Sequence, residues 1–547
     1  MKGRFCILIF LVIIMMGLFF PEKSTRASGD AEVIPVRAAA EALGGSVQWI
    51  KEERALKVRL GSRKWEIVLG SSLSALNEKD FVLVQPAGMN AENMVCVPLQ
   101  SFNGALGVRM EFREGQWMPG REDITGLGMY WMRLMQLGDY DKARSMMNAS
   151  LADLFPDEAL EHYKDSLDET YGSWILLKAD FQENDVHKNA ILIYQTPRGQ
   201  SFRMELRFDK GGRLDDLALL RNTSDTYTSP SYDQPGEYVE KKVTVGTKSL
   251  PLPGTLTIPE QSVGKLPAVV LVHGSGPSDE DESSGGGKMF RDIAVGLANE
   301  GIAVLRYSKR TYEYPNRSLT PNFTVQEETI EDSLSAVKLL QQDERIDSSR
   351  IYVLGHSQGG MLVPKILEED HDDAISGAML LSAPSGSLED LMLQQYKGIL
   401  QRAVDNNETG AELERKRAKV DTWQNAVDML HDDEYSKEQL PALFPLPSAY
   451  WWYDIRRYSG PMIARNQHVP LLILQGENDV QVPLSSLKVW KQALDTRTDV
   501  KYKSYPGLNH MYALYDQPST GDEYRIAANV PGAVIKDLAD WIHLAAK

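Results

Sequence analysis

The segment IYVLGHSQGG, Ile351 to Gly360, decides how the larger part of this chain is interpreted. An apolar run ends at Leu354 and passes directly into Gly-His-Ser-Gln-Gly, after which a helix is expected to begin near Gly360. The pattern G-x-S-x-G between a strand and a helix is typical of a nucleophile elbow, a tight turn that exposes a serine hydroxyl. We therefore predict that Ser357 is a nucleophile. The alternative is an ordinary glycine-rich turn with a hydrogen-bonded serine.

The surroundings of this segment favour the elbow, because strands and helices alternate from about residue 236 to the end. Apolar runs such as LPAVVLVHG, IAVLRYS and VPLLILQGEND end in loop residues, and amphipathic segments lie between them. This alternation predicts an α/β fold with a mostly parallel sheet covered on both faces. Residues 386–468 interrupt it with helical, aromatic-rich sequence, which predicts a cap. The aromatic residues of SAYWWYDIRRY, Ser448 to Tyr458, could line an acyl pocket or pack the cap onto the sheet.

A serine hydroxyl needs a base before it can attack. In this kind of fold the partners follow in the order Ser, Asp or Glu, His, each after a later strand. Asp479 lies in the loop that follows the run LLILQG, and Glu477 is its rival. His510 follows the strand-like run VKYKSY and precedes the last helix. We predict that Ser357 attacks, His510 serves as base and then acid, and Asp479 orients His510.

An oxyanion hole completes such a site. We predict that the backbone N–H groups of Gln358 and of Ser275, in the loop LVHGSGPSDED, supply it. His356 is expected to point away from the site. No pair of histidines has metal-ligand spacing, so the sequence predicts neither a metal nor another cofactor.

The chain has 547 residues, enough for two to four domains, and its formal net charge of −17 argues against nucleic acid as a partner. Lys2 and Arg4 precede an apolar run that ends at Phe20, which predicts a signal peptide over residues 1–27. The run is short for a membrane span of about 20 residues, so an uncleaved anchor is the weaker alternative. We expect a secreted or cell-surface protein. Cys96 is then its only cysteine.

Two segments near the N-terminus resemble each other. IPVRAAAEALGGSVQW, which starts at Ile34, aligns without gaps to VPLQSFNGALGVRMEF, which starts at Val97. Each predicts a strand end, a short helix, a glycine stop and a second strand. Between them, ALKVRL and KWEIVLG alternate like the strands of a hairpin. Residues 30–118 therefore form one predicted domain. Residues 120–225, with a helix pair followed by antiparallel strands, form a second, small α+β domain.

The repeated pattern resembles the stalk domain at the N-terminus of copper amine oxidases, which is common in exported Gram-positive proteins. The resemblance implies a spacer or a module that associates with the cell envelope. It does not imply copper binding here, because no histidine precedes His162 and Cys96 stands alone.

The motifs HGSGPSDEDE, GHSQGGMLVPKI, ILQGENDVQVP and YPGLNH together resemble the secreted or peripheral bacterial α/β-hydrolase esterases. The resemblance covers residues 236–547. It implies an α/β-hydrolase fold and cleavage of small-molecule, short-chain acyl esters, with Ser357, Asp479 and His510 on the family's triad. Ser308 in RYSKR departs from the family, which commonly has Asp there. Two alternatives remain: a thioesterase or peptidase with the same triad, and a surface-binding protein with a vestigial hydrolase domain.

Overall fold

The computed structural model describes residues 32–220, 226–262 and 264–545, and the predicted signal peptide lies outside them. The chain divides between Met118 and Pro119 into two compact units. Within the described part of the chain, no helix combines the length and the apolar character that a membrane span requires.

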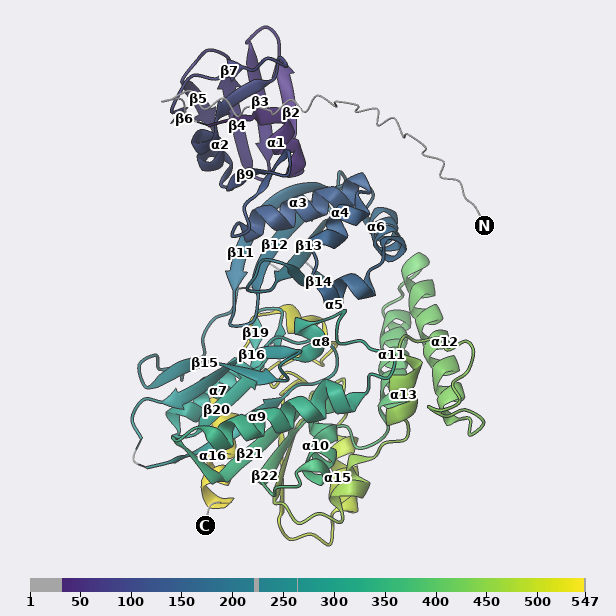
Figure 1. The fold of residues 1–547 in the computed structure, drawn as a ribbon. Coiled ribbons are helices and arrows are strands. Elements are labelled where there is room, and N and C mark those ends of the chain that lie inside the picture. The colour runs from purple at the N-terminus through teal and green to yellow at the C-terminus, as the bar shows by residue number, and fades with distance from the viewer. Residues whose placement is uncertain (1–31, 221–225, 263, 546–547) are drawn as a thin grey trace, which may run out of the picture. The chain divides into compact units, whose positions relative to one another are not determined.

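The first unit contains the two repeats (Figure 1). The first repeat comprises β1 (Val33–Pro35), α1 (Val36–Ala42) and β2 (Ser46–Ile50), and the second comprises β8 (Val95–Pro98), α2 (Leu99–Leu106) and β9 (Met110–Arg113). A sheet in the order β2-β3-β4-β5-β6 adds β3 (Ala55–Leu60), β4 (Arg63–Val68), β5 (Leu73–Leu76) and β6 (Lys79–Val82). β1 and β8 pair antiparallel with Ile34 opposite Val97. These two residues are equivalent in the sequence repeat, so the repeats meet at equivalent positions.

The second unit begins with a helical layer on an antiparallel sheet. The helices are α3 (Ile124–Leu137), α4 (Tyr140–Ser145), α5 (Ala149–Leu154) and α6 (Asp157–Tyr171). The sheet is the meander β11 (Ile175–Glu183), β12 (Lys188–Gln195), β13 (Ser201–Phe208) and β14 (Leu214–Leu220). α3 buries its methionines and aromatic residues, including Trp131 at 0% exposure. These side chains therefore form the core between the helix and the sheet.

The rest of the unit is built on an eight-stranded sheet. Its spatial order is β15 (Tyr238–Gly246), β16 (Pro251–Pro259), β20 (Ala303–Tyr307), β17 (Leu266–Val272), β21 (Ile346–His356), β22 (Ile375–Leu381), β23 (Leu471–Gly476) and β24 (Val500–Tyr505). β16 pairs antiparallel with β15 and β20, and the other pairs are parallel. The near-continuous apolar sequence of β17 and of residues 351–354 in β21 fits strands that are buried on both faces.

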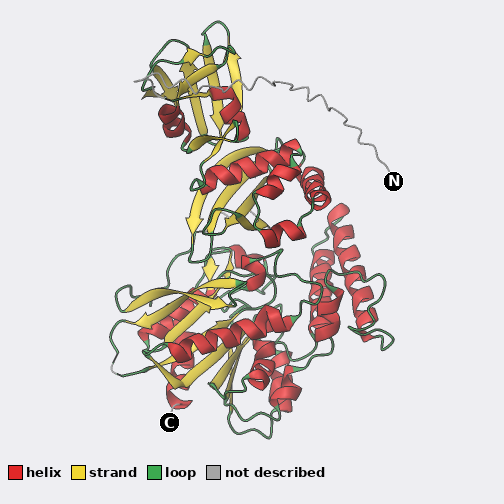
Figure 2. Ribbon diagram, in the orientation of Figure 1, coloured by secondary structure: helices red, strands yellow, loops and turns green. Residues whose placement is uncertain are grey.

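Helices cover both faces of this sheet (Figure 2). One core cluster joins the sheet to α7 (Met289–Asn299) and α16 (Gly532–Ala545). The other joins it to α9 (Glu331–Gln342), α10 (Gln358–Glu369) and α15 (Ser485–Ala493). The architecture is the α/β-hydrolase fold that the sequence predicts.

A helical cap lies between β22 and β23. It consists of α11 (Leu388–Asp405), α12 (Ala411–His431), α13 (Ala449–Ile455) and α14 (Gly460–Ala464). Trp451 and Trp452 of α13 pack against the core cluster on one face of the sheet. Trp452 also meets Trp423 of α12 edge to face at 5.3 Å. Trp451 and Trp452 therefore attach the cap to the sheet domain. Packing the cap onto the sheet is one of the two roles that the sequence allows for these aromatic residues.

A buried ion cluster joins the small α+β region to the sheet domain. His187, fully buried, lies 2.7 Å from the Asp215 carboxylate in β14 and 2.6 Å from the Glu313 carboxylate in α8 (Arg310–Glu313). Burial alone would lower the pKa of His187, but hydrogen bonds and charge interactions with both carboxylates outweigh it and raise that pKa. The His187 ring therefore bridges two parts of the chain.

Candidate active site

The turn at Ser357 has the geometry of a nucleophile elbow. Ser357 has φ 51° and ψ −120°, a conformation that costs a non-glycine residue energy. It stands between the end of β21 and the start of α10, and it is partly exposed although its neighbours are buried. The strain is thus placed at the one residue of the turn that the solvent can reach.

The glycines around Ser357 are required by close backbone contacts. A Cβ on Gly355 would come within 2.5 Å of the Gly359 backbone, and one on Gly359 would come within 2.4 Å of the Val272 carbonyl oxygen. A Cβ on Gly360 would lie 2.8 Å from the Gly355 carbonyl oxygen. Only glycine lets β21, α10 and β17 approach this closely.

Asp479 and His510 meet in loops at the carboxyl ends of β23 and β24. His510 Nδ1 lies 2.8 Å from Asp479 Oδ2, and both side chains are buried. Asp479 Oδ1 accepts hydrogen bonds from the backbone N–H groups of Gln481 and Val482. Glu477 instead accepts a hydrogen bond from Ser504, as expected for a residue nearer the strand. Asp479 is therefore the carboxylate that faces the histidine.

The surroundings of Asp479 keep it ionised. Burial alone would raise the pKa of this carboxyl group, but the charge and hydrogen bond of His510 and the N–H of Val482 outweigh burial and lower that pKa. A charged carboxylate on Nδ1 fixes the imidazole in the tautomer whose Nε2 is free to accept a proton.

The predicted oxyanion loop, which follows β17, lies against the predicted nucleophile. A Cβ on Gly274 would be 3.1 Å from the Ser357 Cβ. Ser275 follows in an exposed turn, and Gln358 is the first residue of α10. The structure thus places Gly274, the residue before Ser275, against Ser357, and Gln358 follows Ser357 directly. The contacts of the described residues include no hydrogen bond between the Ser357 hydroxyl and His510, which is common in enzymes without substrate.

His356 does not point away from the site, which corrects the expectation from sequence. Its Nε2 donates to the backbone carbonyl of His510 at 2.9 Å, and its Nδ1 lies 3.1 Å from Glu282 Oε1. Burial would lower the pKa of His356, but the Glu282 charge and the His510 carbonyl raise it. Glu282 also accepts the Gly274 N–H at 2.8 Å. His356 and Glu282 therefore connect the His510 loop to the oxyanion loop, a role that no motif indicated.

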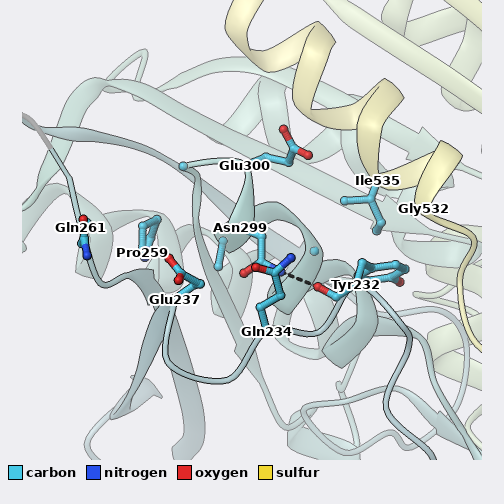
Figure 3. A pocket seen from close by; sticks show the side chains of 12 residues that line it. Tyr232, Gln234, Glu237, Pro259, Gln261, Asn299, Glu300, Gly532 and Ile535 are labelled. Atoms are coloured by element: carbon cyan, nitrogen blue, oxygen red, sulfur yellow. Dashed lines mark hydrogen bonds between the residues drawn. The ribbon is translucent and has the colours of Figure 1, made fainter.

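A cavity of about 300 Å³ lies elsewhere in this unit and holds none of the predicted site residues (Figure 3). It is lined by the segment before β15, the end of α7 and the start of α16, and Asn299 there donates to the Tyr232 carbonyl at 2.6 Å. Because Glu300 and Gly301 lead into the beginning of β20, the cavity lies at the edge where parallel strands start. Catalytic residues of open α/β sheets are found at the opposite, carboxyl edge.

The fold, and the residues gathered at the carboxyl edge of the sheet, define the class of the protein. It is an α/β-hydrolase with a serine at the elbow. A family model described as serine aminopeptidase, S33, matches residues 266–516, and one described as copper amine oxidase N-terminal domain matches residues 22–118. The chain is 35% identical to Esterase EstD of Thermotoga maritima over 383 residues, which cover 68% of this chain and 85% of that protein. It belongs to the α/β-hydrolase family that includes this esterase.

Two further matches are more distant. Phospholipase YtpA of Bacillus subtilis is 24% identical over 196 residues, which cover 34% of this chain and 71% of that protein. The solved structure of Est1E from Butyrivibrio proteoclasticus matches 56% of this chain and 99% of its own at 18% identity, with a TM-score of 0.33.

Proposed function

We propose that this protein is a serine esterase that hydrolyses carboxylic esters of short acyl chains through an acyl-enzyme. Ser357 Oγ attacks the ester carbonyl carbon while its proton passes to His510 Nε2. The carbonyl oxygen becomes an oxyanion that the Ser275 and Gln358 N–H groups bind. Collapse breaks the bond to the alcohol, which leaves with the proton from His510. A water molecule, activated by His510, then attacks the acyl-enzyme in the same way and releases the carboxylic acid and free Ser357.

One observation carries this proposal: a buried carboxylate lies 2.8 Å from His510 at the same sheet edge as the strained turn of Ser357. The 35% identity to a protein named an esterase favours the ester as acyl donor. The other family description, a serine aminopeptidase, keeps the amide bond as the second candidate, because fold and triad do not determine the acyl donor.

The test uses the chain from Ser28 to Lys547 and its Ser357→Ala variant. Both are assayed with nitrophenyl esters from acetate to palmitate, with an acyl thioester and aminoacyl nitroanilides, and with a fluorophosphonate probe. Ser376→Ala is the matched control, since the partly exposed Ser376 hydroxyl donates to the Ser349 carbonyl oxygen and takes no part in the proposed site. We expect ester turnover and labelling in the wild type and the control but not in Ser357→Ala. A folded wild type that neither turns over nor labels would favour a binding role.

We also propose that the protein acts outside the cytoplasm, with residues 30–118 as a surface-association module. The charged and apolar pattern of residues 1–27 and the copper amine oxidase N-terminal domain match support this. Cell fractionation with N-terminal sequencing of the mature protein tests export, and retention of the pattern Lys2 to Phe20 on the mature chain would contradict cleavage. A pull-down of residues 30–118 on isolated cell wall tests the association.

A further inference from the structure

The loop that follows β17 is held by Lys309, the second residue after β20. Lys309 Nζ donates to the Gly274 carbonyl oxygen at 2.9 Å, and the Lys309 backbone N–H donates to the Ser278 carbonyl oxygen at 2.9 Å. The residues between these two points are exposed. One residue therefore anchors both ends of the predicted oxyanion loop, while the centre of the loop is exposed.

The bond to Gly274 determines where the Ser275 N–H points. In a trans peptide the C=O and the following N–H lie in one plane and point in opposite directions. Because the Lys309 ammonium holds the Gly274 oxygen on one side, the Ser275 N–H is directed to the other. The Gly274 N–H is held separately by Glu282 at 2.8 Å. Both peptide planes at Gly274 are thus fixed by charged side chains.

Lys309 is in turn held by a carboxylate that contacts the cap. Lys309 Nζ lies 2.6 Å from Glu328 Oε1, and both side chains are buried, at 3% and 6% exposure. The other Glu328 oxygen, Oε2, accepts the indole N–H of Trp451 at 2.7 Å. Glu328 belongs to the π-helical turn Gln326–Ile330, and Trp451 belongs to α13 of the cap. A buried ion pair is strongly oriented by such additional hydrogen bonds.

We propose that Lys309 is a positioning residue that aims the Ser275 N–H at the oxyanion, and that Trp451 of the cap orients Lys309 through Glu328. This rests on the proposed function, because it takes Ser275 as an oxyanion donor. The cap then acts on the rate of the chemical step and not only on substrate access. The effect passes through successive contacts from Trp451 to Glu328, then to Lys309, and finally to Gly274.

The test compares wild type with Lys309→Met, Trp451→Phe and their double variant, using a nitrophenyl ester. Loss of one oxyanion donor lowers kcat by about 10²–10³. For Lys309→Met, which misdirects the donor, we expect a decrease in kcat of about 10- to 100-fold, with KM within about threefold. Trp451→Phe removes the indole N–H together with part of the ring, and we expect a decrease in kcat of about 3- to 10-fold. The double variant should be no slower than Lys309→Met, because both changes act on one path.

A trifluoromethyl ketone inhibitor supplies the second readout, since its adduct with the serine carries an oxyanion. Its Ki should rise by the same factor as kcat falls. Trp452→Phe is the matched control, because it makes the same change one residue along α13, where the ring packs on Trp423. We expect less than about a twofold change in kcat and Ki.

Three outcomes overturn the inference while the esterase proposal stands: a folded Lys309→Met with wild-type kcat, equal effects of Trp451→Phe and Trp452→Phe, or additive effects in the double variant. If Lys309→Met does not fold, Trp451→Phe decides through kcat and Ki, since it leaves the ion pair intact. A wild type that neither turns over esters nor reacts with fluorophosphonate overturns the proposed function, and this inference with it.

Discussion

The carboxyl edge of the large sheet and the contact with the small α+β region both bury a histidine against carboxylates, but the two histidines are held differently. His187 has one ring nitrogen on Asp215 and the other on Glu313. His510 has Nδ1 on Asp479, and among the described contacts its Nε2 has no hydrogen-bond partner. A ring with both nitrogens engaged bridges parts of the fold, whereas a ring with one free nitrogen can transfer a proton. His356 donates from Nε2 to the His510 carbonyl and has the Glu282 carboxylate within ion-pair distance of Nδ1, so it belongs with His187 although it adjoins Ser357.

The largest effect should come from the ring with the free nitrogen. We expect His510→Ala to lower kcat by about 10⁴-fold or more, because His510 takes the Ser357 proton in the proposed mechanism. Thermal unfolding should show a folded protein. A folded variant that keeps more than a tenth of wild-type kcat would show that His510 is not the base, and the contrast between His510 and His187 would fail.

Asp479→Asn should be next, with a decrease in kcat of about 10³- to 10⁴-fold. The amide oxygen would keep the N–H groups of Gln481 and Val482, so the NH₂ group would face His510 Nδ1. Nδ1 of His510 would then accept a hydrogen bond from this NH₂ group. Nε2 would carry the ring hydrogen and could not act as base. Steady-state kinetics measure this, with Glu477→Gln as the matched control at near wild-type rate. Equal losses in the two variants would contradict the assignment.

His356→Asn should separate the two kinds of histidine within the site. Its loss leaves the Glu282 carboxylate buried without its ion-pair partner, which costs about 3–5 kcal/mol of unfolding free energy. We expect kcat to fall only about 10-fold, through movement of the two loops that His356 and Glu282 connect. Denaturant unfolding and kinetics on the same sample measure both effects. A loss in kcat as large as that of His510→Ala would place His356 among the reacting groups instead.

His187→Gln should have the smallest effect on catalysis, with kcat at pH 7 within about twofold of wild type, and should act on stability in a pH-dependent manner. The folded-state pKa of His187 is raised, so its stabilisation is complete below the unfolded-state value of about 6.5 and is lost as pH rises through the folded-state pKa. The difference in unfolding free energy between wild type and variant should therefore shrink from pH 6 toward alkaline pH. A difference that stays constant, or grows, over this range would show that His187 is not a charged bridge.

The parts of the site that sequence could predict are those carried by local spacing. The glycines of GHSQGG predict the elbow because strand and helix meet there within a few residues. The position of Asp479 beyond Gly476 predicts its contact with His510, because both follow neighbouring parallel strands. The catalytic roles of these residues remain predictions.

The missed residues act through contacts between distant segments. Glu282 meets His356, and Lys309 meets Gly274, across tens of residues of chain. Nothing in DEDESS or RYSKR marks a side chain as buried, because charged residues in loops are usually exposed. One signal could have pointed to Glu282 and Lys309: each is a charged residue in a loop that follows a buried strand at the carboxyl edge of the sheet. The domain limit predicted near residue 225 also stays a prediction, since residues 119–547 form one compact unit.

The close approaches at Gly355, Gly359 and Gly360 have an evolutionary consequence. Each glycine is required by the backbone geometry of the sheet and helix, whereas the hydroxyl of Ser357 is required by none of it. A descendant released from selection for activity could replace the serine at little structural cost, but it could not replace the glycines without rebuilding the fold. An inactive relative that has lost the serine would therefore still have glycines at the positions of Gly355, Gly359 and Gly360. In related sequences, the glycines therefore report the fold, and the residues at positions 357, 479 and 510 report the capacity for the proposed catalysis.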